Sequence, residues 1–346
     1  MKKFLIDMVH FWHHRGGVTH VWDCVLKEWV KSGFASQVIL IDRGELPEVA
    51  KNYQVVKFPY FHNSYQDESE ALQALCDELG ADGFMSSGDT RPLTTPTVQL
   101  VHDFIVEDQT YPHYPPDIFR KHASMNAAQR IIAVSQATAR RIPAFLTDSL
   151  KPLTVAANAS DVSREENIDE LPSVLASQYF LHVGGLYGYK NAEAFLEAVK
   201  DIPDEERDFG LVFTSDASEL LSEHGLQTMD IHCGAFERPA MARVYGKALA
   251  LVHTSRTEGF GLPLIEALAC GCPVICYDNE INREIAGTAA HYILPGENEK
   301  EQIQSALVAM KNPTYRQQLR AAGMVRAAFF SWQETAETYA EELQLL

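Results

Sequence analysis

Residues 258–274 of the chain read Glu258-Gly-Phe-Gly-Leu-Pro-Leu-Ile-Glu266-Ala-Leu-Ala-Cys-Gly-Cys-Pro-Val274. They follow an apolar run, Ala248-Leu-Ala-Leu-Val-His253, whose length and composition predict a buried strand. Pro263 suits the first turn of a helix, and Gly271 suits the C-terminal cap two turns later. The segment therefore predicts a strand, a glycine-rich turn and a short helix. The backbone N–H groups at such a helix N-terminus can hold a phosphate.

Two carboxylates, Glu258 and Glu266, lie on either side of this turn, eight residues apart. A carboxylate repels a phosphate but accepts hydrogen bonds from sugar hydroxyls. Glu266 taken alone also fits a surface glutamate that stabilises a helix N-terminus through the helix dipole. Together with the turn, the two carboxylates indicate a site for a nucleotide sugar.

The composition limits the partners of the chain. A net charge of −18 argues against nucleic acid and against a broad anionic membrane surface. The basic residues Arg120, Lys121, Arg140 and Arg141 are expected to lie on solvated helix faces, which is the more common fate of such groups. The longest apolar runs are strand-length, so we expect at most peripheral membrane contact.

The six cysteines form no CxxC pair and stand mostly in apolar surroundings, which predicts free buried thiols and a cytoplasmic location. Cys270-Gly-Cys272 has no second half nearby that would complete a metal site. At the N-terminus, Asp7 follows a short apolar run, which predicts a buried first strand instead of a signal peptide.

Apolar runs of strand length alternate with amphipathic stretches along the whole chain, which predicts parallel sheets with helices on both faces. The predicted strands are residues 4–9, 37–41, 55–58, 83–86, 97–101, 130–134, 179–183, 209–214, 230–233, 249–253, 273–277 and 291–294. Helices are predicted at residues 18–32, 68–79, 192–200 and 299–311, among others. The polar stretch 158–172 marks a seam, so we expect an N-terminal domain at 1–160, a C-terminal domain at 161–328 and a final helix within 329–346.

Glu258 and Glu266 form an E-x7-E pattern, and further segments accompany it in a fixed order. They are Val101-His102-Asp103, Ile132-Ala-Val-Ser135-Gln-Ala-Thr138, Val155-Ala-Ala-Asn158-Ala-Ser-Asp161, His182-Val-Gly-Gly-Leu-Tyr-Gly-Tyr-Lys190-Asn191 and Phe330-Ser-Trp332. With these segments the chain resembles the retaining glycosyltransferases of family 4, in particular the mannosyl- and glucosyltransferases of bacterial polysaccharide or O-antigen assembly. The resemblance implies the GT-B fold, in which two Rossmann-like, doubly wound α/β domains face each other across a cleft.

The resemblance also implies roles for named residues. His102, Lys190 and Glu258 would be catalytic: His102 would contact the transferred sugar, Lys190 would neutralise the departing diphosphate, and Glu258 would hold sugar hydroxyls. Glu266 would accept both ribose hydroxyls. The implied donor-binding residues are Gly16, Gly17, Gly184, Lys190, Glu258, Gly259, Phe260, Gly261, Leu262 and Glu266.

The implied reaction moves a hexose from a GDP- or UDP-sugar to a glycan or lipid-linked acceptor. Because no nucleophile is evident, attack would come from the front face, and no metal or other cofactor would be required. One departure stands out: many relatives carry a second cation near this lysine, at positions that Gly185 and Tyr189 occupy here. Arg256 or Arg15 could supply that cation.

Other readings stay open. The histidines His10, His13, His14 and His20 invite a metal site, although no matching carboxylate or cysteine pattern accompanies them. The chain could also be a GT-B epimerase or phosphorylase, or a non-catalytic subunit that binds nucleotide sugars. A phosphorylase would need a pyridoxal-binding lysine motif, and none is evident.

Overall fold

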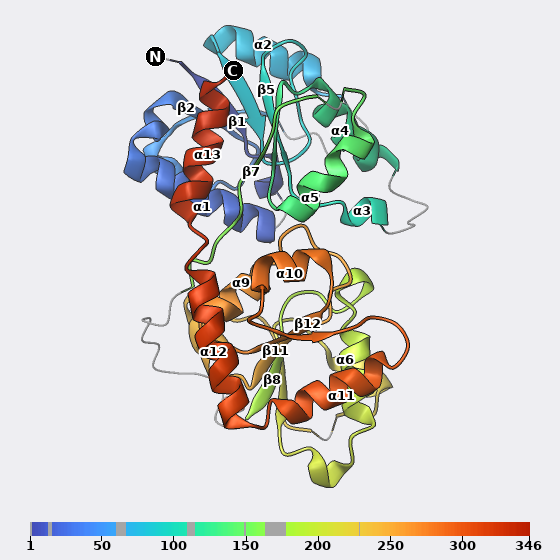
Figure 1. The fold of residues 1–346 in the computed structure, drawn as a ribbon. Coiled ribbons are helices and arrows are strands. Elements are labelled where there is room, and N and C mark those ends of the chain that lie inside the picture. The colour runs from blue at the N-terminus through green and yellow to red at the C-terminus, as the bar shows by residue number, and fades with distance from the viewer. Residues whose placement is uncertain are drawn as a thin grey trace. The chain divides into compact units, whose positions relative to one another are not determined.

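The computed structural model describes residues 2–12, 16–59, 67–108, 115–148, 150–162, 178–227 and 229–346. The chain forms two compact units. Unit 1 comprises Met1–Asn158 together with Ser331–Leu346, and unit 2 comprises Ala159–Phe330. Figure 1 shows the helices and strands of both units.

Unit 1 is built on a parallel sheet of seven strands in the order β3-β2-β1-β4-β5-β6-β7. The strands are β1 (Phe4–Asp7), β2 (Val38–Asp42), β3 (Gln54–Lys57), β4 (Gly83–Ser86), β5 (Thr97–Val101), β6 (Arg130–Ala133) and β7 (Leu153–Val155). The helices are α1 (Gly17–Ser32), α2 (Ser69–Leu79), α3 (Ile105–Asp108), α4 (Pro115–Ala127), α5 (Gln136–Arg141) and α13 (Trp332–Gln344).

The last helix, α13, belongs to unit 1 although it lies at the far end of the chain, and it runs alongside α1 (Figure 1). The indole of Trp29 on α1 donates a hydrogen bond to the carbonyl of Ala336, at 2.8 Å. Arg130 on β6 pairs with Glu342 at 2.5 Å. These contacts bury one face of α13, so the last helix completes the packing of the N-terminal sheet.

Unit 2 is built on a parallel sheet of six strands in the order β10-β9-β8-β11-β12-β13. The strands are β8 (Tyr179–His182), β9 (Gly210–Phe213), β10 (Ile231–Cys233), β11 (Ala250–His253), β12 (Val274–Tyr277) and β13 (His291–Ile293). The helices are α6 (Ala192–Lys200), α7 (Ser218–Glu223), α8 (Arg238–Lys247), α9 (Leu262–Ala269), α10 (Glu280–Ala286), α11 (Glu299–Ala309) and α12 (Pro313–Ala327).

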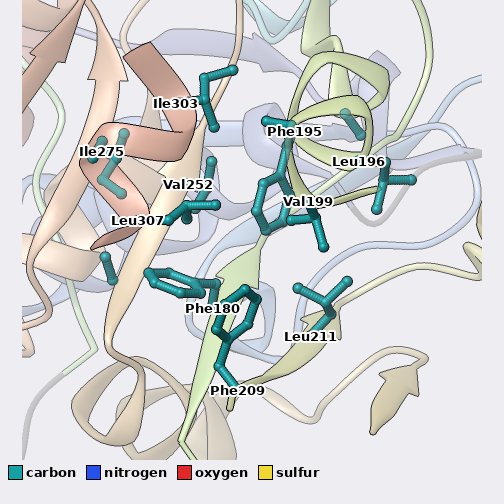
Figure 2. Packing of buried hydrophobic residues seen from close by; sticks show 14 of the residues in the cluster. Phe180, Phe195, Leu196, Val199, Phe209, Leu211, Val252, Ile275, Ile303 and Leu307 are labelled. Atoms are coloured by element: carbon teal, nitrogen blue, oxygen red, sulfur yellow. The ribbon is translucent and has the colours of Figure 1, made fainter. Parts of the chain in front are cut away.

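The core of unit 2 lies between this sheet and two helices, α6 and α11 (Figure 2). Phe180, Leu211, Val252 and Ile275 come from four neighbouring strands, and α6 and α11 cover them with the residues Phe195, Leu196, Val199, Ile303 and Leu307. On the central strands, helices α8 and α9 also pack against β8, β11 and β12. Strands buried on both faces read as continuous apolar runs, which is why the sequence reveals them.

All twelve strands that the sequence predicts are present, and most are one or two residues shorter than predicted. The two-domain α/β fold is confirmed. The sequence does not predict β7, because this strand has three half-buried residues directly after Lys151 and Pro152. In the part of the chain that the structure describes, every helix is too short or too polar to cross a membrane.

Candidate functional site

The predicted strand, turn and helix are all present at residues 250–269. Gly261 is the N-cap of α9 with φ +86°, a left-handed conformation that glycine adopts without strain. Pro263 stands in the first turn and lacks an N–H group, and Gly261 has no side chain with which to cap the helix. The N–H groups of Leu264 and Ile265 donate to the Gly261 carbonyl, so among the described residues only the N–H of Leu262 is left within the first turn of α9 for an external acceptor. Gly271 follows the helix with φ +66°, as predicted.

Lys190 and Glu258 form a direct ion pair in this structure. The lysine Nζ lies 2.6 Å from the carboxylate Oε1, and the two side chains are 13% and 9% exposed. Burial is the largest single influence and acts to lower the pKa of Lys190, but the charge and hydrogen bond of Glu258, together with Tyr189, outweigh it and the pKa is raised. The Lys190 side chain passes over Gly184, where an added Cβ would lie 3.7 Å from the lysine Cε. The structure thus brings together three predicted site residues from two separate loops.

Hydrogen bonds hold the Lys190 loop against the segment that precedes Glu258. The hydroxyl of Thr254 donates to the Lys190 carbonyl at 3.0 Å, and the N–H of Arg256 donates to the Tyr189 carbonyl at 2.8 Å. Asn191, with φ +49°, donates from its side chain to the hydroxyl of Tyr277 at 2.8 Å. These bonds fix the direction in which Lys190 leaves its loop.

Two buried histidines, His182 and His253, end the neighbouring strands β8 and β11. Burial lowers the pKa of each to about 3, and the positive charge of Lys190 acts in the same direction. Both imidazoles are therefore neutral at physiological pH. The Nε2 atom of His253 lies 3.7 Å from the Glu258 carboxylate. Sequence reasoning missed both residues, because a lone histidine at the end of a strand has no distinctive spacing.

Glu266 is buried in α9 and only 4% exposed, so the reading of a surface glutamate is wrong. Its Oε1 accepts a hydrogen bond from Arg238 Nη1 at 2.7 Å, and its Oε2 accepts one from the Tyr245 hydroxyl at 2.8 Å. Arg238 also pairs with Asp161. A carboxylate has about four acceptor sites, so two can still receive a ligand. Arg238 and Tyr245 orient this carboxylate.

Arg238 is a cation that the sequence analysis did not find. Its one signal is position: it opens α8, where the helix dipole disfavours a positive charge. Burial acts to lower the pKa of Arg238, yet the charges of Glu266 and Asp161 raise it overall. Two other residues were expected to supply a second cation. The first, Arg256, is 54% exposed, and its guanidinium lies 3.7 Å from the Glu299 carboxylate. The second, Arg15, lies outside the described residues.

The remaining predicted site residues belong to unit 1. Gly16 caps α1 and Gly17 begins it, with the Gly16 N–H donating to the Thr19 hydroxyl at 2.9 Å. His102 follows β5 and is half-buried, and its Nε2 is covered and has no hydrogen-bond partner among the described residues. Burial chiefly, followed by the charges of His10 and Lys121, lowers the pKa of His102 to about 3. Its imidazole is neutral at physiological pH.

The structure describes part of the histidine group that suggested a metal: His10 is described, and the Nε2 of His20 lies 3.6 Å from the Cys24 sulfur. Of the four N-terminal histidines, His13 and His14 lie outside the described residues. Within unit 2, Glu193, Glu197 and His224 bring ligand atoms within 4.8 Å of one another, but that group contains no predicted site residue.

The second half of the chain matches a family of known proteins. Residues 163–326 match the model of the family "Glycosyl transferases group 1". The chain is 26% identical over 228 residues to O-antigen chain mannosyltransferase B of Escherichia coli, a match that covers 61% of this chain and 59% of the relative. The chain thus spans about three fifths of the length of this curated relative.

Solved structures with the same fold include WaaG and HepE. WaaG, a glycosyltransferase involved in lipopolysaccharide biosynthesis, superposes with a TM-score of 0.77 at 14% identity over 98% of this chain and 99% of that one. HepE from Anabaena, in complex with UDP and glucose, superposes with a TM-score of 0.76 at 15% identity over the whole of both chains. At these identities the likeness shows the fold, which is GT-B. Residues 163–326 of this chain therefore form a glycosyl transferases group 1 domain.

Proposed function

We propose that the protein is a retaining glycosyltransferase of family 4, which transfers a mannose- or glucose-type hexose from a nucleotide-diphosphate sugar to a hydroxyl of a glycan or lipid-linked acceptor. One observation carries the proposal. Lys190, Glu258 and the N-terminus of α9 meet at the carboxyl edge of the neighbouring strands β8 and β11. Ligands of parallel α/β sheets bind beyond this edge.

The chemistry of these groups suits such a donor. The N–H of Leu262 at the start of α9 and the charge of Lys190 are complementary to a diphosphate. Glu266, oriented by Arg238 and Tyr245, is suited to accept the ribose hydroxyls, and Glu258 is suited to accept hydroxyls of the sugar. UDP in HepE and mannose transfer in the E. coli relative support a UDP- or GDP-sugar.

In the proposed reaction, the bond between the anomeric carbon and the phosphate oxygen breaks, and a bond from the same carbon to the acceptor oxygen forms on the same face. The acceptor proton passes to the leaving phosphate oxygen, so no protein nucleophile takes part. Lys190 and the N–H of Leu262 balance the charge of the leaving diphosphate, and no metal is needed in this scheme. We propose that Gly16, Gly17 and His102 of unit 1 contact the donor, and that the enzyme works in the cytoplasm, where its free cysteines stay reduced.

A donor screen followed by single substitutions tests the proposal. Thermal shift against GDP-, UDP-, ADP- and dTDP-sugars identifies the donor, because a ligand that binds only the folded state raises its melting temperature. With that donor, Lys190→Ala and Glu258→Ala are expected to abolish transfer. Lys200→Ala, at an exposed position on α6, is the matched control and keeps activity.

Three results would contradict this function. Full activity in both site variants would overturn the residue assignment. Donor binding without transfer or hydrolysis of any nucleotide sugar would identify a non-catalytic subunit instead. An absorption band of bound pyridoxal phosphate in the purified protein would point to a phosphorylase.

A further inference from the structure

The imidazole of His253 is a buried polar group inside the candidate donor site that the proposed chemistry does not yet use. The residue is 3% exposed, and its Nε2 has no hydrogen-bond partner among the residues that the structure describes. A buried donor or acceptor left without a partner destabilises a protein, so such a group calls for an explanation.

The Nε2 atom of His253 points at the parts of the site that would change on donor binding. It lies 3.7 Å from Glu258 Oε1, just beyond hydrogen-bond distance. It also lies 3.9 Å from the position of a Cβ built on Gly261, the residue that caps α9. The other titratable groups near it are Lys190 and His182. The imidazole thus stands between the carboxylate and the proposed phosphate turn.

Donor binding would remove the hydrogen-bond donor of Glu258, and His253 can replace it. In the structure, Glu258 Oε1 accepts its hydrogen bond from Lys190 at 2.6 Å. The proposed function requires Lys190 to turn toward the diphosphate, which would leave a carboxylate of 9% exposure without its counter-charge. A buried carboxylate in that state needs a new hydrogen-bond donor. A described donor within reach is the Nε2 of His253, which has to move by about 0.7 Å to reach hydrogen-bond distance.

We propose that His253 is a positioning residue. When Lys190 moves to the donor diphosphate, His253 Nε2 replaces it as the hydrogen-bond donor to Glu258. This bond holds the carboxylate in position to accept the sugar hydroxyls. The inference rests on the proposed function. It places the proton of the neutral imidazole on Nε2, since only that tautomer donates to Glu258. A nucleoside monophosphate has no diphosphate to draw Lys190 away from Glu258, so His253 matters only for ligands that carry the diphosphate.

Calorimetric titration of matched ligands separates this role from a structural one. UMP and UDP-glucose, and GMP and GDP-mannose, are titrated into the wild type, His253→Leu and His253→Gln. The control is Cys276→Ala, which changes a buried residue paired in register with His253 on β12. The quantity compared is the ratio of the two dissociation constants, nucleoside monophosphate over nucleotide sugar. Glutamine retains an N–H donor near the position of Nε2, whereas leucine retains only bulk.

We expect His253→Leu to lower this ratio about 10-fold or more, the effect of losing one hydrogen bond to a charged group. The affinity for the nucleoside monophosphate should change by no more than about 2-fold. His253→Gln and Cys276→Ala should keep the wild-type ratio. A ratio unchanged in His253→Leu, or equal losses in the leucine and glutamine variants, would overturn the inference and leave the proposed function standing. A wild-type protein that binds none of the four ligands would overturn both.

A second measurement does not depend on the folding of the leucine variant. In histidine-labelled protein, the imidazole N–H resonance that disappears in His253→Gln should move downfield with UDP-glucose or GDP-mannose and much less with UMP or GMP. An equal response to both members of each ligand pair would refute the exchange of partners at Glu258.

Discussion

Variants of the Lys190–Glu258 ion pair should all lose activity, but only the single variants should lose much stability. Its atoms are 2.6 Å apart, and the side chains are 13% and 9% exposed. Lys190→Met or Glu258→Gln alone leaves one charge largely buried without its partner, which costs about 3–5 kcal/mol of the free energy of unfolding. Because both side chains retain some exposure, we expect the lower end of that range, about 3 kcal/mol. The double variant removes both charges and should cost only about 1 kcal/mol.

Differential scanning calorimetry measures this directly. For a unit of the size of residues 159–330, 1 kcal/mol shifts the melting temperature by about 2–4 °C, so each single variant should melt about 6–12 °C lower. The double variant should melt within about 4 °C of the wild type. In a transfer assay, all three variants should lose at least about 100-fold in kcat, because Lys190 is absent or Glu258 can no longer accept as a carboxylate.

Two results would refute this reasoning. If the stability losses of the single variants simply add in the double variant, the pair is not coupled in the folded protein and the observed contact is not formed in solution. If the double variant folds like the wild type and also retains transfer, then neither group serves the reaction. The exposed Lys200→Ala variant controls for the loss of any lysine charge.

Three further predictions follow from the same site. Tyr245→Phe removes one hydrogen bond to the buried Glu266 carboxylate and should lower the free energy of unfolding by about 1.5–3 kcal/mol in denaturant titrations. The loss should be smaller in a Glu266→Gln background, and equal losses in both backgrounds would show that the bond does not contribute to stability. His182 has a pKa of about 3 in the folded protein and an ordinary value of 6.5, so the unfolded chain binds its proton first and stability falls as the pH drops from 6.5 toward 3. His182→Asn should therefore flatten the slope of stability against pH by about 1.4 kcal/mol per unit over that window, and an unchanged slope would show that the imidazole is not held neutral. Gly261→Ala and Gly225→Ala each strain a positive φ (+86° and +69°) and should destabilise by about 1–2 kcal/mol, but only the change at Gly261 should weaken donor binding in calorimetry; equal affinities would place the phosphate elsewhere.

The strands of this fold could be predicted because each is buried on both faces. Runs such as residues 250–253 and 274–277 stand out as short apolar segments whatever lies beside them. The strand that was not predicted, β7, lacks this burial. Its three residues are only half-buried, so its sequence does not differ from that of a loop. The turn before α9 was equally visible, because glycine and proline mark turns and helix ends through their own backbone preferences.

The partners of the site residues could not be predicted in the same way. The sequence analysis assigned Lys190 to a phosphate and Glu258 to a sugar, yet the structure pairs them with each other. Arg238 and Tyr245 were absent from the analysis, although they hold both oxygens of Glu266. These contacts join residues 21 to 68 positions apart. Local periodicity carries no information on such pairs.

By itself, then, the amino-acid sequence determined the class of fold, the strand–turn–helix around Gly261 and the two carboxylates that flank it. Those features depend on the burial of single segments and on backbone preferences, which neighbouring residues express locally. Tertiary structure alone decided which charges meet. The order of strands places β8 beside β11, and this brings the Lys190 loop, His182 and His253 to the turn that leads to Glu258. A charge buried there must have a partner, and only the packing of the whole unit determines which residue that partner is.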